Sequence, residues 1–258
     1  MFGNHPITRN RAVPLTTVLA LLMSGCTNLG QTPLLPRLQS AAVVTVKQKS
    51  VWVPLLSAAV VVLADADDGI SDWAVDHTPL FGSPPAADDA SDVLVESLMV
   101  SALVSSLLAE PDQGNRFKPI LVNGLSLVAN QKVTKGIKQL AKRKRPTRLS
   151  DQSFPSLHSS RAFAAAEITS RNLALIPLRE RTRLFLDAGI YTLASTAAWA
   201  RVEGRAHYPS DVLAGAALGG FIVGVFNEVF LSRNPSAMVS FHPIPHGAAV
   251  SLHWQPQP

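Results

Sequence analysis

The sequence predicts an all-α fold, a bundle of about six helices followed by a small C-terminal β-hairpin. First, apolar residues recur at helical spacing in six stretches between residues 52 and 231. Second, Ala, Leu and Val are abundant while aromatic residues make up 6% of the chain, a composition that favours close packing of helices. Third, the chain changes character beyond Asn234, where apolar and polar residues alternate as they do in a strand.

The expected helices cover residues 52–65, 91–109, 118–143, 158–175, 180–202 and 210–231. Residues 67–88 hold several glycines and prolines, so we expect a loop between the first two helices. The last helix carries four glycines at helical spacing, which predict a close approach of neighbouring helices: Gly215, Gly219, Gly220 and Gly224. The hairpin is expected from residues 238–242 and 249–254, which flank a turn rich in proline and glycine.

The apolar runs are too short or too often interrupted for a membrane span, which needs about 20 consecutive apolar residues. Pro54 lies in the first run, and charged residues such as Glu96 and Asp187 lie in later ones. With 47% hydrophobic and 16% charged residues, the 258-residue chain is less apolar than a dedicated multispan membrane protein. We therefore expect one large globular bundle rather than an integral membrane protein.

The N-terminus has the layout of a bacterial secretory signal. Arg9 and Arg11 precede an apolar run, and the segment Met23-Ser24-Gly25-Cys26 closes it. This ending resembles a lipobox, in which the cysteine receives lipid chains such as palmitate and becomes the new N-terminus. The alternatives are an uncleaved membrane anchor and a buried thiol.

The lipobox interpretation predicts a location and a division of the chain. The protein would be lipid-anchored in the bacterial envelope and face the periplasm, with the outer membrane favoured because Thr27 follows the cysteine. We expect a signal peptide at 1–25, a tether at 26–40, the helical domain at 41–235, and a C-terminal hairpin and tail at 236–258.

The positive charge of the chain is concentrated in one segment. The formal net charge is +5. Eight basic side chains lie in one short stretch: Lys132, Lys135, Lys138, Lys142, Arg143, Lys144, Arg145 and Arg148. Such a cluster indicates an anionic partner, which could be a phosphate ester, a lipid headgroup or nucleic acid.

Three segments hold residue types that suit a phosphate site. Lys138 and Arg145 are seven residues apart, so they share one face if the helix continues to Pro146. Ser156 suits an N-cap, and the first turn of the following helix offers unpaired N–H groups to an anion, with His158 beside them. Each of these two segments alone is more often an ordinary solvated helix end.

The third segment is the most specific. Pro209 fits the first position of a helix, so His207 lies just before that helix and Asp211 in its first turn. A carboxylate four residues on can bond one ring nitrogen of a histidine and leave the other as a nucleophile or base. Arg201 supplies a fork of donors for phosphate oxygens.

In their order and spacing, these segments resemble the three motifs of the type 2 phosphatidic acid phosphatase and vanadium haloperoxidase superfamily. Those motifs are Lys, six residues, Arg-Pro; Pro-Ser-Gly-His; and Ser-Arg, five residues, His, three residues, Asp. The resemblance implies that Lys138, Arg145 and Arg201 hold the phosphate oxygens, with Ser156 and the N–H groups near Leu157 and His158. It further implies that His207 attacks phosphorus, that Asp211 orients His207, and that His158 protonates the leaving oxygen.

The resemblance therefore predicts an acid phosphatase or phosphatidic acid phosphatase-like hydrolase that uses no metal or other cofactor. The expected substrate is a lipid-linked phosphate monoester or pyrophosphate, and nucleic acid is not expected as a partner. Two functions remain as alternatives: a vanadium-dependent haloperoxidase, and a non-catalytic envelope lipoprotein that binds anions.

Two positions depart from the family pattern. Leu157 stands where the family has glycine, a residue that lets the backbone approach an anion without steric cost. Ala200 replaces a serine. Because every charged and titrating position is present, we expect catalysis to survive. The rival hypothesis is a degraded enzyme that binds phosphate without turnover, which predicts that Leu157→Gly gains an activity absent from the parent.

Overall fold

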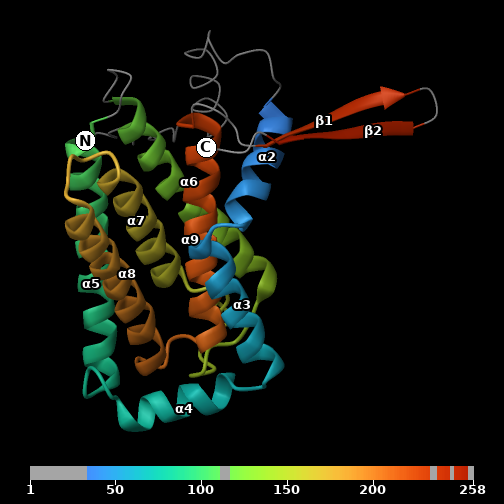
Figure 1. Cartoon of the computed structure of the whole chain (residues 1–258). Helices are drawn as coiled ribbons and strands as arrows, with labels where there is room; N and C mark the ends of the chain where they lie inside the picture. Colours follow the sequence, from blue (N-terminus) through green and yellow to red (C-terminus); the bar gives the residue numbers. More distant parts are fainter. Residues whose placement is uncertain (1–33, 111–116, 233–236, 245–246, 255–258) are drawn as a thin grey trace, which may run out of the picture. The chain divides into compact units, whose positions relative to one another are not determined.

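The structure, a computed structural model, describes residues 34–110, 117–232, 237–244 and 247–254. The described part is helical apart from one pair of strands (Figure 1). The helices are α2 (Leu34–Val46), α3 (Lys49–Leu63), α4 (Asp67–His77), α5 (Pro84–Leu108), α6 (Phe117–Ala141), α7 (Leu157–Leu173), α8 (Glu180–Glu203) and α9 (Pro209–Phe230). The predicted helical class is confirmed, but the described residues contain eight helices rather than about six.

Two strands, β1 (Ala237–Ile244) and β2 (Gly247–Trp254), pair antiparallel, with Ala237 opposite Trp254 and Ile244 opposite Gly247. Residues 245–246, which would form the turn between them, lie outside the described residues. The C-terminal hairpin therefore stays a prediction.

The two helices missed by the sequence pattern are α2 and α4. α2 begins at Leu34, so residues 34–40 of the predicted tether are helical. The predicted loop at 67–88 is wrong, because it contains α4 and the first turn of α5. The prolines there mark a helix start: Ser83 is the N-cap of α5, and Pro84 and Pro85 occupy its first positions, where a missing N–H costs nothing.

α9 packs against α3, α6, α7 and α8, and its contact with α7 is the most extensive between helices. The glycines allow this approach, as predicted. A Cβ at Gly215 would lie 2.5 Å from the carbonyl oxygen of Ser156, and a Cβ at Gly219 would lie 2.8 Å from the backbone nitrogen of Ala164. Both distances are far below van der Waals contact, so larger residues would push α7 away. The first turns of α7 and α9 are thereby held together.

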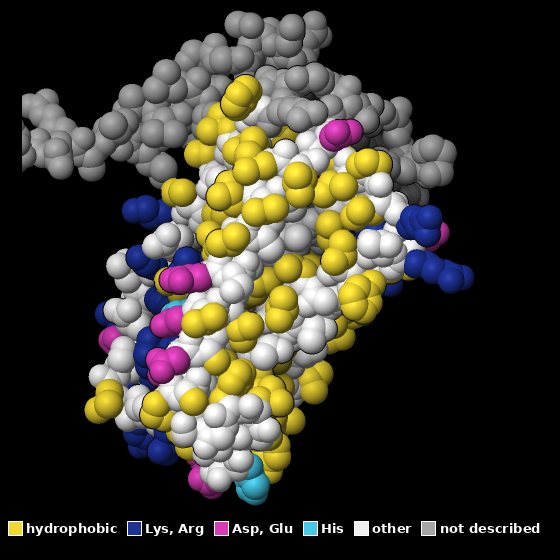
Figure 2. All heavy atoms as spheres, turned by 90° about the vertical axis from the view of Figure 1, so that its left-hand side faces the viewer, with side chains coloured by type: hydrophobic (Ala, Val, Ile, Leu, Met, Phe, Trp, Pro, Cys, Tyr) yellow, Lys and Arg dark blue, Asp and Glu magenta, His cyan; other side chains and the backbone are white. Residues whose placement is uncertain are grey.

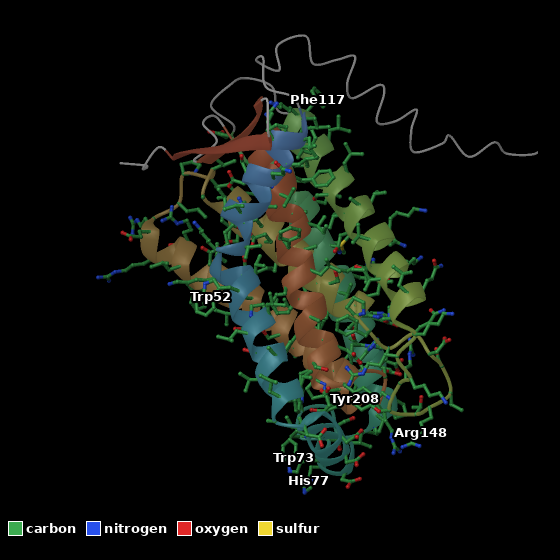
Figure 3. All side chains as sticks on the ribbon, turned by 90° about the vertical axis from the view of Figure 1, so that its right-hand side faces the viewer. Trp52, Trp73, His77, Phe117, Arg148 and Tyr208 are labelled. Carbon is green, nitrogen blue, oxygen red and sulfur yellow. The ribbon has the colours of Figure 1, made fainter. Side chains whose placement is uncertain are left out.

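Loops and helix ends meet at one end of the bundle. α4 runs across this end and contacts α8 and α9 (Figure 1). Trp73 and His77 on α4, Tyr208 before α9 and Arg148 in the loop after α6 all lie there, whereas Phe117 lies at the other end (Figure 3). The three segments singled out from the sequence therefore reach the same end of the bundle.

Among the described residues, two helices, α5 and α9, are long and apolar enough to cross a membrane, and α2 and α3, bent by 67°, make a third span if they count together. Hydrophobic side chains cover much of the face that carries α5 (Figure 2), and Val93, Val100, Leu103 and Leu107 are each more than half exposed there. The premise that no run qualifies as a span is thus wrong, because single acidic residues such as Glu96 leave these helices predominantly apolar. These helices indicate membrane association.

Candidate active site

A cavity of about 230 Å³ opens at the end of the bundle where the three segments meet. Five of the predicted site residues line it: Lys138, Arg145, Leu157, His158 and His207. Lys135, Gln139 and Gln152 complete the lining. The side chains come from α6, the loop after α6, the first turn of α7 and the loop before α9. Segments far apart in the chain therefore share one positively charged cavity.

His207 and Asp211 form the most buried part of the site, with 1% and 0% of their surfaces exposed. The Nδ1 atom of His207 lies 3.9 Å from Oδ2 of Asp211, which leaves Nε2 as the other ring nitrogen for chemistry. Burial lowers the pKa of His207 to about 4, although the nearby carboxylate of Asp211 works against this shift. The ring is therefore neutral near pH 7, the state that a nucleophile requires.

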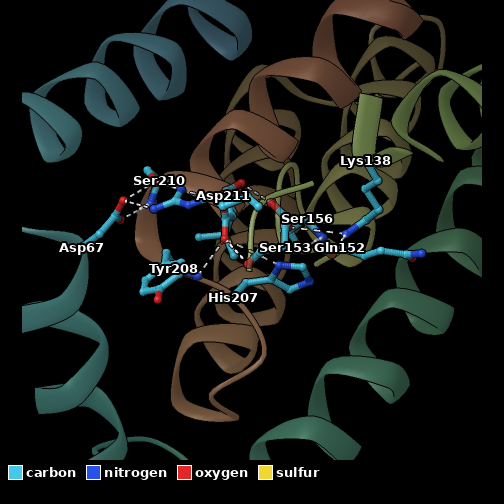
Figure 4. Close-up of polar contacts among 12 residues, drawn as sticks. Asp67, Lys138, Gln152, Ser153, Ser156, His207, Tyr208, Ser210 and Asp211 are labelled. Atoms are coloured by element: carbon cyan, nitrogen blue, oxygen red, sulfur yellow. Dashed lines mark hydrogen bonds and ion pairs between the residues drawn. The ribbon is translucent and has the colours of Figure 1, made fainter. Parts of the chain in front are cut away.

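The Asp211 carboxylate accepts hydrogen bonds at both oxygens (Figure 4). Oδ1 accepts from the guanidinium of Arg143 at 2.7 Å. Oδ2 accepts from the hydroxyl of Ser153 at 2.5 Å and from the backbone N–H of Tyr208 at 3.0 Å. The bond from Tyr208 also satisfies an N–H at the start of α9. Asp211 is thus both a helix cap and the partner of His207.

Lys138 and Arg145 reach the cavity by a route that the sequence did not predict. α6 ends at Ala141, four residues before Arg145, so the two residues do not share a helical face. The backbone turns at Lys142, whose φ of 45° is left-handed, and Arg145 lies in the loop. Lys138, in the last turn of α6, donates to the carbonyl oxygen of Gln152 at 2.5 Å. A loop thus carries Arg145 to the same cavity.

Two of the arginines have unused donors. Within the described part of the chain, the buried Nε atoms of Arg145 and Arg201 have no hydrogen-bond partner. Arg201, in the last turn of α8, pairs through Nη1 with Asp88 of α5 at 2.9 Å. Burial, together with the charge of Arg145, lowers the pKa of Lys138 to about 8. Buried donors without acceptors and crowded cations are both relieved by a bound anion.

The first turn of α7 carries the remaining predicted residues. Ser156 is the N-cap, and its hydroxyl accepts from the N–H of Ser159. The N–H of Ser156 donates to the carbonyl oxygen of Asp211 at 2.9 Å, which joins α7 to α9. Leu157 lies in the cavity lining, and His158 beside it pairs through Nε2 with Asp92 of α5 at 2.8 Å. Burial and the charge of Arg201 lower the pKa of His158, while Asp92 raises it.

Several residues around the site were missed from the sequence. Arg143 had been counted within the basic cluster, and Asp67 lies at the start of the segment that was expected to be a loop. Asp88 and Asp92 are four residues apart, so they share one face of α5, and this spacing was the signal available for them. Nothing in the sequence marked Ser153, because its role depends on how the loop after α6 folds back.

Some further side chains lie away from the cavity or outside the described residues. Cys26 belongs to the latter group. Trp73 and His77 stack on each other on α4 and do not line the cavity. In the described part of the chain, no three side chains of His, Cys, Asp or Glu are arranged to hold a metal ion.

Comparison with models of protein families gives a match to this chain. The model of a family described as the PAP2 superfamily matches residues 119–235, from the first turn of α6 to just beyond α9. The matched region therefore contains the three motif segments, whereas α2 to α5 lie outside it. No curated protein and no solved structure matches the chain.

Proposed function

Because the chain belongs to the PAP2 superfamily, whose members are phosphatases, we propose that it hydrolyses phosphate monoesters or pyrophosphates through a phosphohistidine on His207. The observation that carries this proposal is the cavity itself. A buried neutral histidine, poised against a carboxylate, faces a space whose walls hold Lys138 and Arg145, with Arg201 nearby. An anion with several oxygens would satisfy the unpaired Nε donors of both arginines.

The covalent step needs a nucleophile and stabilisation of negative charge. In the proposed mechanism, Nε2 of His207 attacks phosphorus and the bond between phosphorus and the ester oxygen breaks. Asp211 orients the ring and stabilises the positive charge that it acquires. Lys138, Arg145 and Arg201 stabilise the charge on the phosphoryl oxygens, the dominant requirement of phosphoryl transfer.

The leaving oxygen and the second step need a proton donor and acceptor. His158 lines the same cavity and donates its proton to the leaving oxygen. Water then attacks the phosphohistidine and gives a proton to His158, which restores both histidines and releases phosphate. The roles of His207 and His158 thus require one neutral and one protonated imidazole in the same site.

We further propose that the substrate is lipid-linked. Two helices apolar enough to cross a membrane support this, as does Leu157, which adds an apolar wall to a cationic cavity. The proposed lipid anchor at Cys26 would hold the protein in the envelope and facing the periplasm. The mass of the N-terminal peptide from purified protein, compared with a Cys26→Ser variant, tests the anchor independently of activity.

The test of the function is phosphate release by purified protein from a panel of lipid phosphates, prenyl pyrophosphates and soluble esters. We expect turnover that EDTA does not abolish and that vanadate inhibits, because vanadate copies the geometry of the transferred phosphoryl group. Quenching in detergent at alkaline pH during turnover should trap a phosphoprotein that is stable to base and labile to acid, and that His207→Gln does not form. Absence of turnover on the whole panel contradicts the proposal, and bromide oxidation after vanadate loading would indicate a haloperoxidase instead.

A further inference from the structure

The guanidinium of Arg143 bonds to the carboxylates of both Asp211 and Asp67, which Figure 4 labels at the site end of the bundle. Nη1 donates to Oδ1 of Asp211 at 2.7 Å and to the hydroxyl of Ser210 at 2.8 Å. Nη2 donates to Oδ2 of Asp67 at 2.8 Å. The central carbon of the guanidinium lies 4.5 Å from the centre of the Tyr208 ring. Hydrogen bonds therefore hold the edge of the guanidinium, and the Tyr208 ring packs against its face.

Asp67 brings a separate part of the chain to this network. It is the first residue of α4, where the helix dipole favours a negative charge. Its carboxylate accepts from the backbone N–H of Ser210 at 2.9 Å and from the hydroxyl of Ser210 at 2.5 Å. The N–H of Ser210 lies in the first turn of α9, where no acceptor exists within the helix. Asp67 thus ties the start of α4 to the start of α9.

The contacts of Asp211 show what this network controls. Arg143 holds Oδ1, while Ser153 and Tyr208 hold Oδ2, the oxygen that faces His207. A carboxylate bonded at both oxygens cannot rotate without breaking a bond, and Asp211 has no exposed surface through which water could replace one. The position of Arg143 therefore sets the direction in which Asp211 presents Oδ2.

We propose that Asp67 and Arg143 form a positioning pair that holds the Asp211 carboxylate in line with the His207 nucleophile. The inference rests on the proposed function and extends the site beyond the matched family region, because Asp67 lies outside residues 119–235. Neither residue touches the phosphate. They act through Asp211, so their loss slows the chemical step and leaves substrate binding intact.

The chemistry of arginine suits this role in a way that lysine does not. The guanidinium is a planar, rigid fork, and here its two outer nitrogens serve Asp211 and Asp67 at the same time. An ammonium is a compact point charge on a flexible stem, so a lysine can neutralise one carboxylate without aligning both. The proposal therefore predicts that charge alone does not rescue the site.

The experiment compares Asp67→Asn, Arg143→Lys and the double variant with the parent protein on the best substrate of the panel. We expect kcat to fall about 10-fold in Asp67→Asn and about 10²-fold in Arg143→Lys, because misplacing reacting groups by about 1 Å can cost 10²-fold. KM and the inhibition constant of vanadate should change less than about 3-fold, since the phosphate ligands are untouched. The kcat of the double variant should equal that of Arg143→Lys, because the effects of substitutions within one hydrogen-bond network are not additive.

Matched controls are Asp72→Asn, an exposed acid on α4, and Arg181→Lys, the same substitution at an exposed arginine of α8. Both should retain the parental kcat. Unchanged kcat in Asp67→Asn and Arg143→Lys, or a rise in KM with kcat retained, overturns the positioning role. A lowered melting temperature with the parental kcat in these variants also overturns the positioning role, because it shows that the pair only stabilises the fold. If Arg143→Lys does not fold, Asp67→Asn decides, and an inactive parent refutes the proposed function instead.

Discussion

The two histidines of the site belong to regions of opposite character. His207 lies in a closed region formed with Asp211, Ser153 and Arg143, where His207 itself is 1% exposed. His158 lies in an open region with Arg201 and two acids of α5, where the side chains of Asp88 and Asp92 are 47% and 65% exposed. Asp211 and Ser153 beside His207 have no exposed surface, whereas the acids beside His158 meet water.

Under the proposed mechanism, this difference separates two tasks. A nucleophile must be neutral and aimed before the substrate arrives, and burial against a fixed carboxylate achieves both. A proton donor must exchange protons with water between turnovers, which requires access to solvent. To bind the phosphate, Arg201 must also turn some of its donors away from Asp88. This ion pair breaks at low cost, because Asp88 is exposed and water can replace Arg201 as its partner. The closed region is therefore preorganised, and the open region can be rearranged by the substrate.

The largest expected effect comes from removing each histidine in turn. His207→Ala should abolish turnover of every ester, a loss of more than about 10⁴-fold, because the covalent intermediate cannot form. His158→Ala should cost about 10²-fold on an alkyl phosphate but only about 3-fold on p-nitrophenyl phosphate, whose leaving oxygen needs little protonation. The measurement is kcat for both esters in both variants.

The comparison of the two leaving groups tests whether His158 is the proton donor. An equal loss on both esters in His158→Ala would show that His158 does not act as the acid. Measurable turnover by His207→Ala would remove the assigned nucleophile. His77→Ala, a change of an exposed histidine on α4, is the control and should leave both rates unchanged.

A smaller effect is expected from pH. His207 is active when neutral, so kcat/KM should rise with pH through about 4, the value to which burial lowers its pKa. His158 is active when protonated, and burial and Arg201 lower its pKa below the ordinary 6.5, so kcat/KM should fall again at mildly acidic pH. We therefore predict a bell-shaped profile with an acidic optimum.

The pH profile should also show the titration of Lys138 at higher pH than that of the two histidines. Lys138, with a pKa lowered to about 8, should lose its charge in the alkaline range and weaken substrate binding there. The profile is measured as kcat/KM at constant ionic strength from about pH 3 to 9. An optimum above pH 7 would contradict the assignment of neutral His207 and protonated His158.

The sequence was informative where a pattern depends on local backbone geometry. The six long helices follow from hydrophobic periodicity, and Pro209, Gly215 and Gly219 mark the start and the packing face of α9. α4 was missed because its helical character rests on two acids in the first turn, with Ser71 and Ala74 as its buried residues, which is too short an apolar stripe for the periodic signal.

The site residues likewise divide into those that motif spacing predicts and those that only the folded structure brings together. Lys138, His158 and His207 were predicted from motif spacing, and the structure places all three in the lining of one cavity. The pairing of Arg143 with Asp67 could not be predicted from spacing, because the two residues are 76 positions apart in the sequence. The continuous helix assumed between Lys138 and Arg145 also hid the turn at Lys142 that directs Arg143 toward α9.

The smallest effect tests the open region alone. Asp92 raises the pKa of His158, so in Asp92→Asn the histidine should lose its proton at lower pH, and the alkaline side of the kcat/KM profile should move toward acid. Because Asp92 is largely exposed, water screens this interaction, and kcat at the optimum should fall less than about 3-fold. Asp89→Asn, an exposed neighbour on α5, is the control and should leave the profile in place. A movement of the acidic side instead would mean that Asp92 acts on His207, and the separation between a closed and an open region would fail.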